Sequence, residues 1–187
     1  MARIRPGASP GPVPDRGALH EAALTHLSRY AATEAGLVRV LDRRIARWAR
    51  AAGAADEDVI LSRRTAREVA RALVGSGAVD DAAFAEARAR RLVRAGRSRR
   101  AVAAHLAAKG VGSEQAQAAM PDPEAEFLAA IAFVRRRRIG PFGDPDAEPA
   151  RPLAAMARAG FPRDVAERAL QMSRDEAEKR LLALKQG

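Results

Sequence analysis

Histidine and carboxylate side chains are the residues of this sequence best suited to acid–base or metal chemistry, and their placement argues against both. Of the 3 histidines, His20 and His26 are six residues apart, on different faces of a helix, and His105 is remote in sequence. Acidic residues gather at 56–58 and 80–81, where helices are expected to begin and where capping accounts for them. There is no cysteine and no glycine-rich loop followed by Lys-Ser or Lys-Thr. We therefore predict no catalytic residues, no metal site, no cofactor and no enzyme activity.

Arginine is the residue type whose pattern points to binding. Lys and Arg number 33 against 23 Asp and Glu, a formal net charge of +10, which favours a polyanionic partner. Guanidinium groups bind phosphates or carboxylates in bidentate fashion, so either DNA or an acidic protein surface would serve. The predicted binding residues recur along successive helices: Arg39, Arg43, Arg47, Arg50, Arg63, Arg67, Arg71, Arg88, Arg91, Arg94, Arg97, Arg135, Arg136 and Arg137. A solvated helix face is the simpler explanation for any single one of them, whereas the whole set favours a polyanionic partner.

Composition and apolar spacing predict an all-α fold. The chain of 187 residues is rich in Ala, Arg, Leu and Glu, and only 4% of its residues are aromatic. Apolar residues at helical spacing predict helices over 19–32, 34–51, 58–74, 82–95, 99–109, 113–120 and 123–138, two short helices around residue 160 and a last helix after residue 173. Residues 1–17 are rich in Pro and Gly and are expected to form a disordered tail. No apolar run is long enough to span a membrane.

The two large aromatic side chains of the first helices are expected in the core. Trp48 continues the stripe that Leu37 begins, and Tyr30 belongs to the series Leu24, Leu27, Tyr30 and Ala31 at helical spacing. Ile60 is expected to face inward from the next helix. Because these positions assign Trp48 and Tyr30 to packing, base stacking is not expected to be the main binding mode.

A tight corner between two helices is expected at residues 75–85. Gly75 and Gly77 can both adopt positive φ and close the preceding helix. Either Asp80 or Asp81 then accepts hydrogen bonds from free amides at the next helix N-terminus. Val79 and Phe84 stand near the spacing of a hydrophobic staple, so both are expected to be buried at this junction.

An internal repeat recurs at a constant offset of 50 residues. Leu106, Gly110, Val111 and Met120 correspond to Met156, Gly160, Phe161 and Leu170. Each copy predicts a helix closed by glycine, an apolar contact after the stop and a second antiparallel helix. A single short helix pair buries little apolar surface, so the copies are expected to stack on other helices.

These features together resemble the RecX family of recombination regulators. The strongest match is the segment 72–85, with its leucine, glycine, aliphatic residue, aspartate pair, phenylalanine and alanine in the order of the family signature. The Gly96-Arg97-Ser98 segment and the helix closed by Gly160-Phe161 add support, and the resemblance covers about residues 19–184. It implies tandem three-helix repeats that form an elongated helical array. The expected parts are a tail at 1–17 and repeats at 18–78, 79–138 and 139–187, the third with a long connecting loop.

The resemblance also implies a function. Members of this family bind filaments of the RecA recombinase on single-stranded DNA, and they mainly inhibit its ATPase, strand-exchange and coprotease activities. The chain is then expected to be a cytoplasmic monomer with no membrane partner, acting in recombinational repair and the SOS response. Two alternatives stay open from the residues themselves. One is a general basic helical DNA-binding module without a recombinase partner, and the other is a purely structural helical adaptor.

Overall fold

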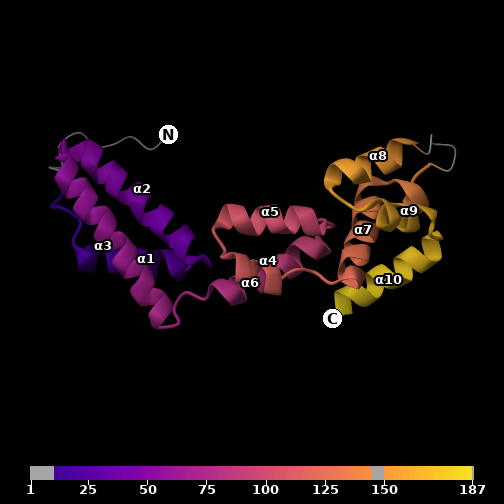
Figure 1. Ribbon diagram of the computed structural model, residues 1–187, viewed down its shortest axis with the longest axis horizontal. Helices are drawn as coiled ribbons and strands as arrows, with labels where there is room; N and C mark the ends of the chain where they lie inside the picture. Colours follow the sequence, from indigo (N-terminus) through magenta and orange to yellow (C-terminus); the bar gives the residue numbers. More distant parts are fainter. Residues whose placement is uncertain (1–10, 145–149, 187) are drawn as a thin grey trace. The chain divides into compact units, whose positions relative to one another are not determined.

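Helices account for all the regular structure in residues 11–144 and 150–186, which are the residues that the computed structural model describes (Figure 1). No strand occurs within these ranges, which confirms the predicted all-α class. The chain divides into two units between Asp81 and Ala82. The first unit contains α1 (Arg16–Leu27), α2 (Glu34–Ala52) and α3 (Asp56–Gly75). The helices that follow are α4 (Asp81–Arg94), α5 (Arg99–Lys109), α6 (Ser113–Ala118), α7 (Pro123–Arg137), the short 3₁₀ helix η1 (Gly140–Phe142), α8 (Ala150–Ala159), α9 (Arg163–Gln171) and α10 (Arg174–Gln186).

The core of the first unit lies where α3 packs against α1 and α2. The predicted stripe of Leu37, Leu41 and Ile45 on α2 is completely buried. Trp48 is only partly buried, and its indole Nε1 donates a hydrogen bond of 2.8 Å to the carbonyl of Gly11. That carbonyl lies in the segment expected to be a tail, of which residues 1–10 are outside the described residues.

Three residues that were expected in this core are exposed. Tyr30 is 62% exposed because α1 ends at Leu27, so that Tyr30 falls in the turn after the helix instead of on its inner face. Leu24 is 45% exposed because Leu19 and Ala23 form the buried side of α1, and the next residue points about 100° away from it. Ile60 is 67% exposed because it stands two residues before the buried Ser62, about 200° around the helix from it.

The corner at 75–85 forms, with different roles for its residues. Gly77 closes α3 at a φ of 75°, whereas Gly75 is the last residue of that helix and needs no positive φ. Asp81 begins α4, so the N-cap position of α4 falls on Asp80. The Asp81 carboxylate accepts a 2.8 Å hydrogen bond from the backbone N–H of Glu34, at the start of α2. Asp81 therefore satisfies the N-terminus of another helix, beside its N-cap Thr33, whose hydroxyl accepts from the N–H of Gly36 at 2.9 Å.

The expected hydrophobic staple across this corner is wrong. Val79 is buried in the core of the first unit, where it joins residues of α1–α3. Phe84 is half-buried and packs with residues of α4–α6 instead. The two side chains belong to different cores because α4 turns its apolar side toward α5.

The repeat at an offset of 50 residues is present in the backbone. Gly110 and Gly160 end α5 and α8 at φ values of 79° and 88°. In both copies the residue after the glycine donates to a carbonyl five residues earlier, Val111 to Leu106 at 3.1 Å and Phe161 to Met156 at 3.2 Å. All four of these side chains are buried. The pairs α5–α6 and α8–α9 are thus two copies of one motif.

The contacts of α7 bear on where the repeats divide. This helix packs against α9 and α10, and its side chains Phe127, Ile131 and Val134 form the middle of their shared core. Residues of α4–α6 form a smaller cluster of their own. We therefore propose that the third repeat begins with α7, near residue 123, and not at residue 139.

Candidate basic interface

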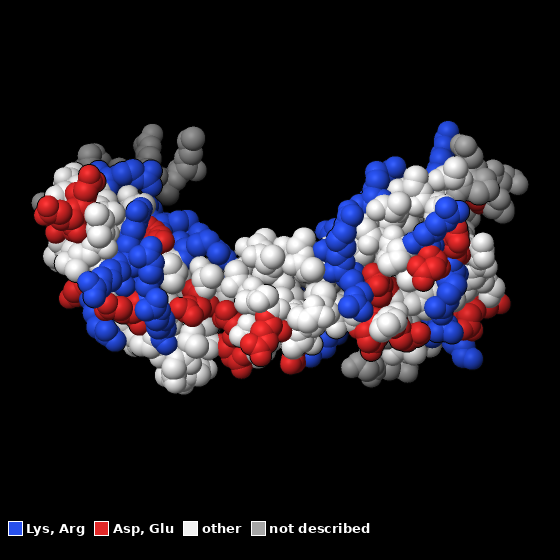
Figure 2. All heavy atoms as spheres, viewed as in Figure 1, with Lys and Arg blue, Asp and Glu red and all other residues white. Residues whose placement is uncertain are grey.

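The predicted arginines lie on the surfaces of both units. Figure 2 shows basic side chains gathered over α2 and α3 in the first unit, and over the α7–α10 region in the second. Thirteen of the fourteen predicted arginines are exposed, and the exception is Arg88, which is half-buried. The side chains of these thirteen arginines are therefore accessible to solvent.

Most of the predicted arginines are not neutralised by ion pairs. The pairs within the described residues join mainly arginines outside the predicted set to a glutamate four residues away, as Arg90 does with Glu86 and Arg163 with Glu167. Arg71 belongs to the predicted set, and its Nε lies 4.0 Å from a carboxylate oxygen of Glu34, which is distant in sequence. Solvent-exposed pairs of this kind contribute little to stability. The described residues thus include arginines paired with glutamates of the chain, such as Arg90, and arginines without an ion pair, such as Arg94 and Arg135.

A close approach of two helix ends brings one of these groups together. Gly96 ends α4 at a φ of 70°, and it is buried against the backbone of α7. A Cβ atom at Gly96 would lie 2.7 Å from the backbone nitrogen of Phe133, so any larger residue would push the helices apart. Val93, one turn earlier, enters the core of α7–α10. The end of α4 is therefore fixed beside the end of α7.

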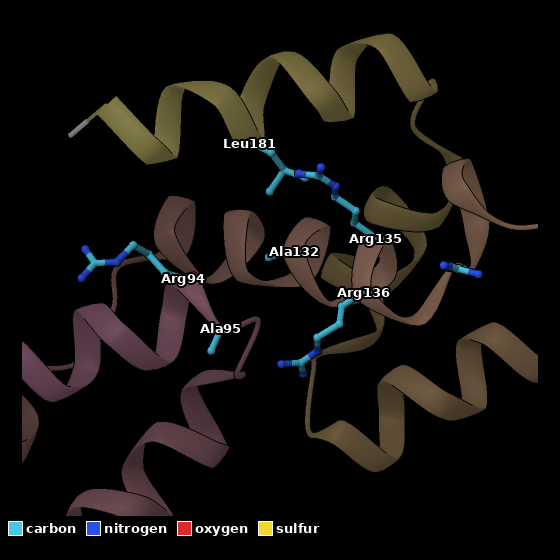
Figure 3. Close-up of a pocket in the computed structure, with 7 residues that line it drawn as sticks. Arg94, Ala95, Ala132, Arg135, Arg136 and Leu181 are labelled. Atoms are coloured by element: carbon cyan, nitrogen blue, oxygen red, sulfur yellow. The ribbon is translucent and has the colours of Figure 1, made fainter.

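Four arginines surround the pocket that this approach creates, which we call the arginine pocket (Figure 3). It has a volume of about 590 Å³, and it is lined by Arg94, Ala95, Ala132, Arg135, Arg136, Arg138 and Leu181. In Figure 3 the side chain of Arg135 extends toward Leu181 of α10, whereas Arg94 points away from Arg136. No ion pair holds these four arginines within the described part of the chain. Because the guanidinium groups do not converge on one point, the pocket suits an extended ligand with several negative charges.

Arg138 has an unusual backbone conformation. Its φ of 54° makes it the one non-glycine residue with positive φ in the described ranges. It ends α7 as Gly96 ends α4, since its N–H donates to Arg135 at 3.1 Å and the next N–H, of Ile139, donates to Val134 at 3.0 Å. A side chain in this conformation costs about 1–2 kcal/mol. In this strained conformation Arg138 brings a fourth positive charge to the pocket, where the negative end of the α7 dipole also favours a cation.

Arg137 and Arg88, both in the predicted set, contact an aromatic ring and an imidazole. The guanidinium of Arg137 lies over the ring of Phe133, 5.7 Å from its centre. Arg88 donates from Nε to Nε2 of His105 at 2.8 Å, so this imidazole nitrogen must be unprotonated. Burial, followed by the positive charges of Arg88, Lys109 and Arg97, lowers the pKa of His105 below its ordinary value of 6.5. The neutral form of His105 therefore holds Arg88 in place.

Part of this site was missed by the sequence reasoning. Arg138 was left out of the predicted set although it continues the run Arg135–Arg137, and the run itself was the available signal. Leu181 had no signal, because nothing local in the sequence places α10 beside the end of α7. Residues 11–144 and 150–186 contain no group of three histidine or acidic side chains placed to hold a metal ion. No helix among them is both long and apolar enough to cross a membrane.

Replacing Arg138 by glycine should relieve the backbone strain at this position. We expect Arg138→Gly to raise the free energy of unfolding by about 0.5–1 kcal/mol, the relief of backbone strain less the greater freedom of glycine in the unfolded chain. Urea denaturation measures this change. Arg138→Lys keeps the strain and the charge and should leave stability unchanged. A glycine variant less stable than the original protein would contradict the claim that the backbone of Arg138 is strained.

The lowered pKa of His105 predicts a dependence of stability on pH. Below pH 6.5 the unfolded chain binds a proton that the folded protein resists, so the contribution of His105 is present above this pH and is lost as pH falls toward the lowered pKa. Denaturation at pH 7.5 and at about 5.5 should show this loss, and His105→Gln should reduce it. His20→Gln, at an exposed histidine, is the matched control. An equal pH dependence in all three proteins would contradict the assignment.

Comparisons with known proteins agree with the architecture and with the resemblance seen in the sequence. The model of the second three-helix domain of RecX matches residues 80–120, which contain α4–α6. The regulatory protein RecX of Agrobacterium fabrum (strain C58 / ATCC 33970) is 37% identical over 107 residues, 56% of this chain and 58% of that protein. A crystal structure of regulatory protein RecX has the same fold, with a TM-score of 0.61 and 20% identity over 84% of this chain and 72% of that one.

The regulatory protein RecX of Myxococcus xanthus (strain DK1622) extends the likeness to most of the chain. It is 35% identical over 159 residues. The aligned part covers 81% of this chain and 83% of that protein, so it includes helices of both units. From this match, and from the three-helix domain within it, we conclude that the chain belongs to the RecX family of regulatory proteins.

Proposed function

We propose that the protein binds filaments of a RecA-type recombinase on single-stranded DNA, and that it mainly inhibits their ATPase, strand-exchange and coprotease activities. The observation that carries the proposal is the family match over about four fifths of the chain. The arginine pocket supports it by offering a place where an acidic filament surface can bind. The protein would act as a monomer wherever the recombinase acts, in recombinational repair and the SOS response.

The mode of action we propose is steric and electrostatic. The pocket presents four guanidinium groups around the apolar side chains of Ala95, Ala132 and Leu181. Such a surface can pair with carboxylates or phosphates while its apolar part excludes water. Arg43 and Arg47, on the first unit, offer a further contact. Two contacts on one chain raise the avidity for a polymer that repeats its binding surface.

Inhibition follows from occupation of the filament. A protein bound across several recombinase subunits would obstruct the approach of a second duplex, and it would restrain the motions that accompany ATP hydrolysis. This mechanism requires no chemistry from the protein itself, in keeping with the expectation that it is not an enzyme. The alternative is a general DNA-binding module, for which the net charge of +10 would suffice.

Charge removal at the pocket tests the proposal against a matched control. The triple variant Arg94→Gln, Arg135→Gln and Arg136→Gln removes three charges from the arginine pocket. The control variant Arg64→Gln, Arg90→Gln and Arg163→Gln removes three charges from arginines that already pair with glutamates. We expect the pocket variant to raise the concentration needed for half-inhibition of the recombinase ATPase about tenfold, a loss of about 1.4 kcal/mol, and the control to change it little. Equal effects would show that only net charge matters, and an original protein without effect on the ATPase would contradict the proposed function.

A further inference from the structure

A groove in the first unit combines an exposed aromatic ring with unpaired arginines. It lies where the turn after α1 passes beside α2, and it has a volume of about 360 Å³. We propose that this groove binds unpaired nucleotides of a single-stranded nucleic acid directly. One base would stack on Tyr30, and the neighbouring phosphates would pair with Arg29, Arg44 and Arg47. The inference goes beyond the proposed function and does not depend on a recombinase.

Tyr30 has the properties of a stacking platform. Its backbone is fixed at the end of α1, where its N–H donates to the carbonyl of His26 at 3.0 Å. The ring of Tyr30 has its centre 5.3 Å from that of His26, at a tilt of 36°, so the imidazole supports one part of it. The residue is otherwise 62% exposed. An anchored and accessible aromatic ring offers its surface to an incoming base.

Three cations line the same groove as this ring. Arg44 and Arg47 are three residues apart on α2, so their side chains leave the helix on the same side. Arg29 precedes Tyr30 in the turn and lines the same groove. All three are exposed, and none has an ion-pair partner within residues 11–144 and 150–186. Aromatic rings beside cations that follow the backbone are the usual means of holding single strands.

The aromatic ring favours single-stranded nucleic acid over the other polyanions. In a duplex the bases are stacked and paired inside, so their faces are not available to Tyr30. An acidic peptide would use the arginines and leave the ring without a role. The groove volume is near the lower end of the range of about 300–1,000 Å³ for ligand sites, which suits one nucleotide unit. Because every base has a stacking face, no strong base preference is expected.

Substitution of Glu21 should change the affinity for nucleic acid in the direction opposite to the loss of an arginine. It is the one carboxylate among the residues that line the groove. It opposes the binding of phosphate, and Glu21→Gln should therefore tighten binding. Removal of the charges of Arg44 and Arg47 should weaken it and should also reduce its dependence on salt.

The test uses the full chain and a short labelled oligothymidylate, without recombinase. We expect Tyr30→Ala to weaken binding about tenfold, in the range that loss of one stacked base gives. Tyr30→Phe keeps the ring and should bind like the original protein. Arg64→Gln, at an arginine paired with Glu68, is the charge control and should have little effect. Each variant is first compared with the original protein by thermal unfolding, and Tyr30 is exposed enough for its removal to leave the fold intact.

A spectroscopic signal makes the stacking itself visible. The chain contains 1 Tyr and 1 Trp, so a Trp48→Phe background leaves Tyr30 as the dominant fluorophore. Oligothymidylate should quench this fluorescence, whereas polyglutamate and inorganic phosphate should not. The inference is overturned if Tyr30→Ala binds oligothymidylate as tightly as the original protein. It is also overturned if polyglutamate displaces the oligonucleotide equally well from the original protein and from Tyr30→Ala. Failure here would not contradict the proposed function, because the ATPase test compares variants of the arginine pocket, which does not include Tyr30.

Discussion

The close contact between the end of α4 and the backbone of α7 is the constraint on which the second unit depends. Gly96 permits it, because a Cβ there would lie 2.7 Å from the nitrogen of Phe133. A similar contact follows along the chain, where the Ser98 hydroxyl donates to the carbonyl of Ala159 at 2.7 Å and a Cβ at Gly160 would lie 2.9 Å from that hydroxyl oxygen. The ends of α4, α5 and α8 are thus held against neighbouring helices of this unit. The same arrangement gathers the cations of α4 and α7, since basic residues are favoured where helices finish.

Local signals in the sequence were sufficient for the elements and for the repeat. Gly110 and Gly160 predict where helices stop, and the stripe from Leu37 to Ile45 predicts the buried side of α2; the structure confirms both. Signals that depend on a helix boundary were less reliable. Tyr30 has helical spacing with Leu27, yet α1 ends before Tyr30, so that a residue expected in the core is exposed. Asp81 shows a further limit, because its partner Glu34 is distant in sequence and only the folded chain brings them together.

The sequence predicted that arginines would form the candidate site, but it did not predict where on the fold they would gather. Fourteen arginines at helical spacing could not indicate which ones share a pocket, since that depends on how α4, α7 and α10 pack. The structure separates arginines that pair with nearby glutamates, such as Arg163, from those that surround a pocket, such as Arg135. Arg138, whose backbone is strained, is among the arginines that surround the pocket. A regulator that acts by occupying a polyanionic filament needs this second population and no catalytic group.

Sedimentation of the protein with recombinase filaments tests the central claim most directly. The protein is mixed with recombinase-coated single-stranded DNA, with bare single-stranded DNA and with free recombinase, and the bound fraction is measured over a range of salt concentrations. We predict that it sediments with the coated DNA at salt concentrations that release it from bare DNA, and that it does not associate stably with free recombinase. Equal retention on bare and on coated DNA would contradict the account, because binding would then need no recombinase.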